Sequence, residues 1–333
     1  YKRQNLHLII YMEKKQFVIG LDLGGTNSVF GLVDENNEIK ATTSVDTQKY
    51  EYAWEFVADA VNAINEMSII AGGIDNVKAL GIGAPCGNIK DGTIEHAANI
   101  RWAKGVVPLA KMFYDSLSIP VAITNDAKAA ALGEMRYGAA RGMKNFIEIT
   151  LGTGVGSGIV ANGQLIYGCD GFAGELGHTI IDYENGRPCG CGRKGCLDMY
   201  CSIRGVVLTA REMVSGYYGE TKLKDIEDNT MTTLDIYNAA VNGDELAIEV
   251  FRKTGETLGK ACANFATFLS PEAFIFFGGL AKAGDLLLKP AKETYNKYIL
   301  SLYKDKAKFL QSGLEDGTAA ILGAAAVGWE INK

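Results

Sequence analysis

Apolar runs separated by short polar or glycine-containing turns divide the chain into two similar series of expected strands. In each series a first strand ends at a glycine-rich turn, a second strand follows, and an asparagine-containing turn leads into a third. The runs cover residues 17–21, 28–33 and 39–45 in the first series, and 146–151, 159–160 and 164–167 in the second. Each series predicts an antiparallel meander. The repetition predicts two similarly built domains that face each other across a cleft.

Helical periodicity predicts a long helix after the first meander, over residues 50–70. We expect the apolar side chains on one face of this helix to belong to the core. They are Trp54, Val57, Val61 and Ile64, flanked by Phe56 and Met67. Other apolar runs predict buried strands at 77–83, 121–124 and 274–277, and helices at 127–137, 245–269 and 318–329. We expect the alanine-rich last helix to return to the first domain.

Composition narrows the class of protein. The 333 residues are 47% hydrophobic and carry a net charge of −6, which is typical of a globular chain and gives no basic footprint for nucleic acid. No apolar run reaches the roughly 18 residues that a membrane span requires. The run 6–11 is too short and wrongly flanked for a signal peptide. We therefore expect a cytoplasmic protein without a membrane partner, and we expect residues 1–16 to be an N-terminal extension without a function.

A histidine and three cysteines are concentrated between Gly174 and Asp198. His178, Cys189, Cys191 and Cys196 form the ligand set of a closed tetrahedral zinc site. Disulfides or a redox pair are the alternatives. The odd total of seven cysteines and the absence of a secretory signal favour metal. We expect the remaining cysteines to be small core residues. They are Cys86, Cys169, Cys201 and Cys262.

Two glycine turns occupy matching positions in the two meanders. Asp22-x-Gly24-Gly25-Thr26-Asn27 follows the first strand of one, and Leu151-Gly152-Thr153-Gly154 follows the first strand of the other. Such turns offer free backbone N–H groups to phosphate oxygens. Either turn alone is typical of a plain hairpin, whereas the matched pair favours a nucleotide. Asp22 can hold a hydrated Mg²⁺ beside those phosphates. Gly278-Gly279 suits the close approach of an adenine or ribose, or simply helix packing.

Asn125 and Asp126 follow the expected strand 121–124 and open a helix. Asp126 is either the N-cap of that helix or a general base at a strand end. The spacing of the residues does not separate the two interpretations.

These motifs, in this order, resemble the ROK family of sugar kinases and repressors. The resemblance rests on Asp22-x-Gly-Gly-Thr, Asn125-Asp126, Leu151-Gly-Thr-Gly, Glu175-x-Gly-His178 and Cys189-x-Cys-Gly-x-x-Gly-Cys196, and it runs from about residue 17 to the C-terminus. It implies an α/β protein with the actin-like ATPase fold, in which two ribonuclease-H-like domains close on ATP and a sugar. It also implies Asp126 as the base for the sugar hydroxyl. The sugar contacts it implies are Asn99, Asn125, Asp126, Glu175, His178 and Asp198.

The resemblance also implies the domain organisation and the assembly. The N-terminal domain would comprise 17–125 plus 317–333. The C-terminal domain would comprise 126–316 and contain the zinc loop 174–198. A homodimer is common in the family and is expected here. Two residues depart from the family pattern: Asp198 replaces a glutamate, and Lys128 puts a cation near the base, where it lowers the basicity of Asp126 or points to solvent.

Within the family the chain most resembles the bacterial glucokinases, at residues 81–85 and 152–158. This implies transfer of the γ-phosphate of ATP to the 6-hydroxyl of glucose. N-acetylmannosamine, N-acetylglucosamine, allose and fructose remain alternative substrates. A sugar-sensing regulator would need a DNA-binding domain before the first turn. Only 21 residues precede Asp22, and they are not patterned for such a domain, so a regulator is disfavoured.

Overall fold

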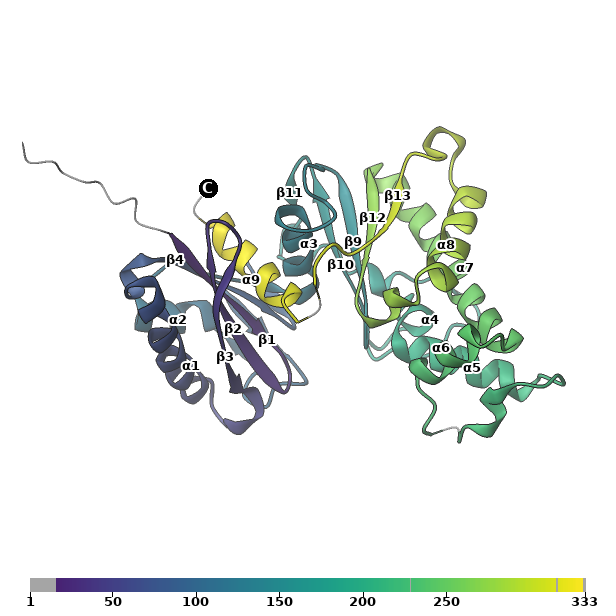
Figure 1. Cartoon of the computed structure of the whole chain (residues 1–333), viewed down its shortest axis with the longest axis horizontal. Helices are drawn as coiled ribbons and strands as arrows, with labels where there is room; N and C mark the ends of the chain where they lie inside the picture. The colour runs from purple at the N-terminus through teal and green to yellow at the C-terminus, as the bar shows by residue number, and fades with distance from the viewer. Residues whose placement is uncertain (1–15, 228, 316, 332–333) are drawn as a thin grey trace, which may run out of the picture.

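The computed structural model describes residues 16–331, apart from 228 and 316. The expected N-terminal extension 1–16 therefore lies, except for Gln16, outside the described residues. Two five-stranded sheets form the centres of two halves (Figure 1). The strands of the first sheet follow the order β3-β2-β1-β4-β8, and those of the second follow β11-β10-β9-β12-β13. A small third sheet has the order β5-β6-β7.

The strands begin and end close to the apolar runs. Those of the first half are β1 (Phe17–Leu23), β2 (Asn27–Asp34), β3 (Ile39–Asp46), β4 (Val77–Ala84), β5 (Gly87–Asn88), β6 (Thr93–Glu95), β7 (Val106–Val107) and β8 (Val121–Asn125). Those of the second half are β9 (Phe146–Leu151), β10 (Val155–Ala161), β11 (Gln164–Leu165), β12 (Ala273–Phe277) and β13 (Lys308–Gln311).

Nine α-helices lie within the described residues. They are α1 (Ala53–Ser68), α2 (Leu109–Leu117), α3 (Asp126–Arg136), α4 (Asp198–Cys201), α5 (Ile203–Ser215), α6 (Thr233–Val241), α7 (Glu245–Leu269), α8 (Asp285–Tyr298) and α9 (Ala319–Glu330). Short 3₁₀ turns complete the connections, and one of them, Leu176–His178, carries the histidine of the predicted metal site. No helix in the described part of the chain is both long and apolar enough to cross a membrane.

The two large sheets have the same topology. In each, the first three strands in sequence pair antiparallel, and two later strands join parallel to the first. The predicted meanders and their duplication are thus confirmed. Because parallel strands end at the same edge, β1, β4 and β8 deliver their carboxyl ends together, and so do β9 and β12. The residues that follow these ends are the ones expected to carry chemistry.

The strand after the second glycine turn is longer than the expected run 159–160, because it begins at Val155 and includes Gly156 and Gly158. Helix α3 crosses this strand closely. A Cβ on Gly156 would lie 2.7 Å from the Cβ of Ala127, and one on Gly158 would lie 2.4 Å from that of Ala131. These two glycines therefore serve the packing of a helix on a strand, and the turn itself is confined to residues 152–154.

The core of the first half lies between its sheet and helices α1 and α2. The predicted stripe of α1 is partly wrong. Trp54 is 63% exposed and stacks on Tyr52, with ring centroids 6.3 Å apart. Phe56 instead occupies the centre of the interface and stacks on Trp102, at 4.7 Å between centroids. The helix is therefore rotated so that Phe56, and not Trp54, points into the core.

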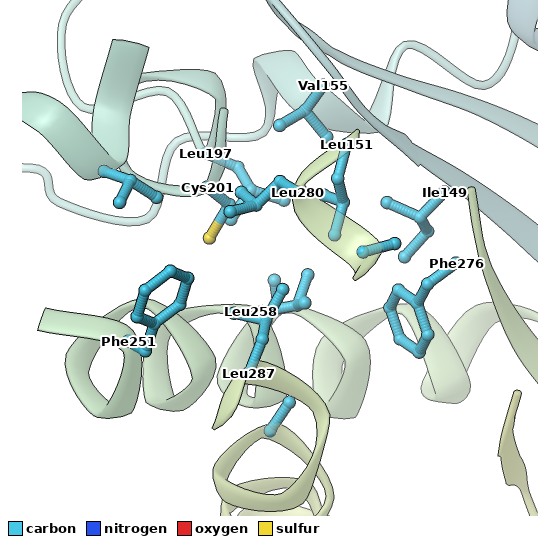
Figure 2. Close-up of a cluster of buried hydrophobic side chains, with 14 of the residues drawn as sticks. Ile149, Leu151, Val155, Leu197, Cys201, Phe251, Leu258, Phe276, Leu280 and Leu287 are labelled. Atoms are coloured by element: carbon cyan, nitrogen blue, oxygen red, sulfur yellow. The ribbon is translucent and has the colours of Figure 1, made fainter. Parts of the chain in front are cut away.

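The second half has a larger core between its sheet and the α5–α8 helices (Figure 2). Ile149 and Leu151 of β9 and Phe276 of β12 face Leu258 of α7 and Leu287 of α8. Cys201 and Cys262 are buried there, as expected, whereas Cys86 and Cys169 are exposed. The expectation of a core role is wrong for the latter two because both lie on loops: Cys86 between β4 and β5, and Cys169 after β11.

Helix α9 brings the end of the chain back to the first sheet. It packs on β1 and β4, on the face opposite α1 and α2, and against α3 of the other half (Figure 1). Gly20 and Gly81 of these strands allow the helix backbone to approach the sheet closely, since a Cβ on Gly81 would lie 2.1 Å from the carbonyl oxygen of Ala324. The domain bounds expected from the sequence stay a prediction, but the contacts of α9 agree with a first domain formed by both ends of the chain.

Candidate functional site

A cavity of about 410 Å³ opens where the carboxyl ends of the two sets of parallel strands approach each other. Seven of the predicted site residues line it. They are Asp22, Asp126, Gly152, Thr153, Gly154, His178 and Asp198. The walls thus combine the carboxylates of Asp22 in β1 and Asp126 in α3 with the second glycine turn and the predicted metal loop.

Asp126 is the first residue of α3, and Asn125 is the N-cap. The Asn125 side chain accepts a hydrogen bond from the Ala127 backbone N–H at 3.0 Å. The interpretation of Asp126 as the N-cap is therefore wrong, although its Oδ1 also accepts from the Ala127 N–H, at 2.8 Å. Since Asn125 satisfies the helix end, the second carboxyl oxygen of Asp126 is available to the cavity.

The two carboxylates of the cavity are electrostatically linked. Burial, and then repulsion from Asp126, raises the pKa of Asp22 to about 6. Burial also raises the pKa of Asp126, against the opposing effect of the Ala127 N–H, Asn125 and Lys128. The Asp126 side chain is solvent-accessible and opens into the cavity. A carboxylate whose pKa is raised in this way is a stronger base than one in water.

The two glycine turns have similar internal hydrogen bonds. The Gly24 N–H donates to the Asn27 carbonyl at 3.1 Å, and the Gly152 N–H donates to the Gly154 carbonyl at 3.0 Å. Gly152, Thr153 and Gly154 line the cavity. The predicted residues of the first turn lie outside the lining of the cavity: Gly24, Gly25 and Thr26 connect β1 to β2, and Asn27 is the first residue of β2.

Asn99 lies beside the first glycine turn. The Gln48 side chain donates to the Asn99 carbonyl at 2.6 Å and also to that of Gly25. Gly278 lines a second cavity, of about 310 Å³, which shares Phe277 with the first. A Cβ on Gly278 would lie 2.6 Å from the Leu151 carbonyl oxygen, so this glycine brings β12 close to the second turn. Gly279 lies outside both linings.

The four predicted metal ligands are assembled. Their ligand atoms all lie within 4.8 Å of one another. Cys189 Sγ is 3.7 Å from His178 Nδ1, and Cys191 Sγ is 3.6 Å from Cys196 Sγ. Tetrahedral zinc with Zn–S bonds of about 2.3 Å separates its sulfurs by roughly 3.8 Å. The residues therefore fit zinc in both donor type and spacing.

The zinc loop is anchored to the helices that follow it. Arg187 donates to the carbonyl of Met199 at 2.7 Å and to the Glu212 carboxylate at 2.6 Å. Arg193 donates to the carbonyl of His178 at 2.9 Å. The ligand set is thus held from both sides, and His178 is fixed between the cluster and the cavity.

Asp198 joins the metal loop to the second glycine turn. It is buried at the start of α4, and its Oδ1 accepts from the Val155 backbone N–H at 2.7 Å. Its Oδ2 lies 3.2 Å from Arg204 Nη2. Sequence reasoning missed this link because Val155 is 43 residues away.

Glu175 does not line the cavity, yet it lies within electrostatic range of groups that surround it. The pKa of the Cys86 thiol is raised by burial and then by Asp126, Glu175 and Glu95. Burial lowers the pKa of Lys128, and Glu175, Asp170 and Asp126 oppose that shift. Lys128 is 1% exposed, so the alternative in which it points to solvent is wrong.

Two further polar residues at the site were missed. Thr150 lines the cavity at the end of β9 and donates to Glu148 at 2.8 Å. Glu148 is fully buried, which raises its pKa well above the usual range, and its Oε2 has no hydrogen-bond partner among the described residues. The position of Thr150 at a strand end was a usable signal. A lone glutamate within an apolar strand gave none.

Comparisons with known proteins agree with this arrangement. The ROK family model matches residues 18–330. The glucokinase of Halalkalibacterium halodurans is 36% identical over 322 residues, which is 96% of each chain. The crystal structure of a ROK family glucokinase from Streptomyces griseus, in complex with glucose and AMPPNP, is 33% identical, with a TM-score of 0.72, and the match covers 94% of this chain and 99% of that one.

A regulator is also similar. The xylose repressor of Caldicellulosiruptor bescii is 31% identical over 255 residues, which is 75% of this chain and 62% of the repressor. The family model and the two glucokinases match nearly the whole described chain, and the fold is the two-sheet actin-like ATPase fold that the resemblance implied. The chain belongs to the ROK family.

Proposed function

We propose that this protein is an ATP-dependent hexose kinase that phosphorylates the 6-hydroxyl of glucose. The observation that carries the proposal is the shared cavity of about 410 Å³, in which Asp126 and Asp22 lie with the 152–154 turn and His178. A base, a phosphate-binding turn and a polar wall around one space are the parts that phosphoryl transfer to a hydroxyl requires. The similarity to two bacterial glucokinases supports glucose as the acceptor.

In the proposed mechanism Asp126 accepts the proton of the sugar 6-hydroxyl as that oxygen attacks the γ-phosphate. The raised pKa of Asp126 suits this role, and closure of the two halves on the substrates would exclude water and favour transfer to the sugar over hydrolysis. The backbone N–H groups of the two glycine turns bind phosphate oxygens, and Gly278-Gly279 borders the adenosine. Mg²⁺ bound near Asp22 would neutralise phosphate charge.

The sugar is proposed to lie between Asn125-Asp126 and the zinc loop, in contact with Asn99, Glu175, His178 and Asp198. Because Nδ1 of His178 faces the Cys189 sulfur, Nε2 remains for a sugar hydroxyl. A carboxylate has about four lone-pair sites, so Asp198 can accept from a sugar hydroxyl in addition to Val155 and Arg204. Zinc would fix these side chains without contact with the sugar.

The deciding experiment is an ADP-release assay on the purified protein with a panel of hexoses and N-acetylhexosamines. We expect glucose to give the highest kcat/KM. A preference for N-acetylmannosamine, N-acetylglucosamine, allose or fructose would retain the kinase and replace the acceptor. The repressor similarity makes a sugar-binding regulator the second candidate. Sugar binding without ADP release from any member of the panel would favour that candidate and contradict the kinase.

A further inference from the structure

Three side chains, two near β5 and one on α3, donate to three successive carbonyl groups of one loop. This loop, residues 166–175, connects β11 to the turn that carries His178, and it ends at Glu175. Lys90 Nζ donates to the Cys169 carbonyl. Asn88 Nδ2 donates to the Asp170 carbonyl at 3.1 Å, and Lys128 Nζ donates to the Gly171 carbonyl at 3.0 Å.

Two of the three donors are themselves fixed. Asn88 is 2% exposed, and its amide also donates to Glu95 at 3.0 Å and accepts from the Lys90 backbone N–H at 3.0 Å. Lys128 is buried on α3, two residues after Asp126. A buried ammonium requires hydrogen-bond partners and compensating charge. The Gly171 carbonyl supplies a partner, and Asp126, Glu175 and Asp170 supply negative charge.

The loop is shaped to fit these donors. Gly171 has a φ of +91°, which disfavours any residue with a side chain. A Cβ there would also lie 2.3 Å from Asn88 Oδ1. The loop backbone therefore lies directly against Asn88, with no side chain between them.

We propose that Lys128 is a positioning residue that, together with Asn88 and Lys90, fixes loop 166–175 against α3 and thereby sets the position of Glu175 relative to Asp126. The three residues that separate Gly171 from Glu175 are too few to relax independently, since the Ala173 N–H donates to the Tyr167 carbonyl and the Ser157 hydroxyl donates to the Gly174 carbonyl. The inference rests on the proposed function in so far as Glu175 contacts the sugar.

The first test measures the loop itself. Lys128→Met keeps the apolar stem but removes the donor, whereas Lys128→Gln keeps an N–H donor. Lys111→Met, at an exposed ion pair on α2, is the matched control. We expect amide hydrogen exchange in peptides spanning 166–175 to be roughly tenfold faster in Lys128→Met than in the wild type, because a charged hydrogen bond is lost. Lys128→Gln should lie close to the wild type, and Lys111→Met should match it.

The second test separates positioning from folding. In Lys128→Met we expect the KM for the sugar to rise roughly tenfold while the KM for ATP changes by less than about twofold, with most of the loss recovered in Lys128→Gln. A purely structural role would lower the active fraction and leave both KM values unchanged. Unaltered loop exchange in Lys128→Met, or equal changes in both KM values, would overturn the proposal.

Two outcomes need separate controls. If Lys128→Met does not fold, Lys90→Met removes the exposed donor of the same set and should accelerate loop exchange by a smaller factor; no acceleration would overturn the proposal. If the wild type phosphorylates none of the sugars, the proposed function fails. Hydrogen exchange, which needs no turnover, then tests by itself whether Lys128 fixes loop 166–175.

Discussion

At the scale of single residues, Asp126 is the proposed general base. Asp126→Asn keeps the size of the group and a hydrogen-bond acceptor for the Ala127 N–H, but it removes the base. We expect kcat to fall by roughly 10²–10⁴-fold while the sugar dissociation constant changes little, because general-base catalysis contributes about that much. Steady-state kinetics and calorimetric sugar titration measure the two quantities. Near-normal turnover would contradict the assignment.

The raised pKa of Asp22 leads to a prediction about the stability of the fold. Its pKa in the folded protein, about 6, lies above the ordinary 3.8, so the folded state favours the neutral form. The associated stability is present below pH 3.8 and is lost as the pH rises through 6. The free energy of unfolding of Asp22→Asn should therefore be close to that of the wild type at pH 4, and higher than that of the wild type by about 1–3 kcal/mol at pH 7.

Urea unfolding at both pH values tests this expectation. Asp91→Asn, at an exposed turn, is the control for a change of charge alone. If Asp22→Asn differs from the wild type by the same free energy of unfolding at pH 4 and pH 7, the charged form of Asp22 does not destabilise the fold, and the prediction is wrong. Because Asp22 is also proposed to lie beside Mg²⁺, the stabilised variant should be impaired as a kinase.

At the scale of elements, the fit of α9 on the first sheet depends on missing side chains. In Gly81→Ala the new Cβ would lie 2.1 Å from the Ala324 carbonyl oxygen and 2.4 Å from the Gly328 nitrogen, so the helix must move. We expect a loss of at least about 2 kcal/mol in the free energy of unfolding, which is within the range of overpacked cores. Gly105→Ala, where a Cβ meets no atom within 4 Å, should be neutral. Equal stability of the two variants would contradict this view of the interface.

Elements were predicted from sequence more reliably than their orientation. The meanders and helix 245–269 were predictable because β-branched runs bounded by turns, and long helical periodicity, are local signals. Helical periodicity gives the width of an apolar stripe but not its centre, which is why Trp54 was wrongly placed in the core. The glycines of β10 resembled a turn because the helix they accommodate, α3, is not adjacent in sequence.

The same limit applies to the site. The metal ligands and the two glycine turns were found because each is a compact motif. The partners of Lys128 and Asp198 were not found, because Gly171 and Val155 each lie 43 residues away. The burial of a polar side chain by a partner so far away in the sequence cannot be predicted from the residues around it.

At the scale of the whole molecule, zinc should affect the two ligands unequally. Zinc bound to the cluster would hold His178 directly, whereas Asp198 connects the metal loop to the second glycine turn through the hydrogen bond that its Oδ1 accepts from the Val155 N–H. We expect removal of zinc by a chelator, or Cys191→Ser, to weaken sugar binding by at least about tenfold more than ATP binding, in line with the effect of outer ligand-orienting contacts. Calorimetric titration of each ligand tests this. Equal losses would indicate a metal that serves folding alone.

The return of α9 to β1 and β4 has a consequence for the order of events during synthesis. The ribosome releases the first sheet early, but the helix that covers one of its faces emerges only after the whole second half. The second half, whose strands and helices lie within one continuous stretch, can fold while the apolar face of the first sheet is still uncovered. The nascent chain should therefore expose Val18, Val33 and their neighbours until α9 has emerged, and chaperones are expected to bind the incomplete first half during that time.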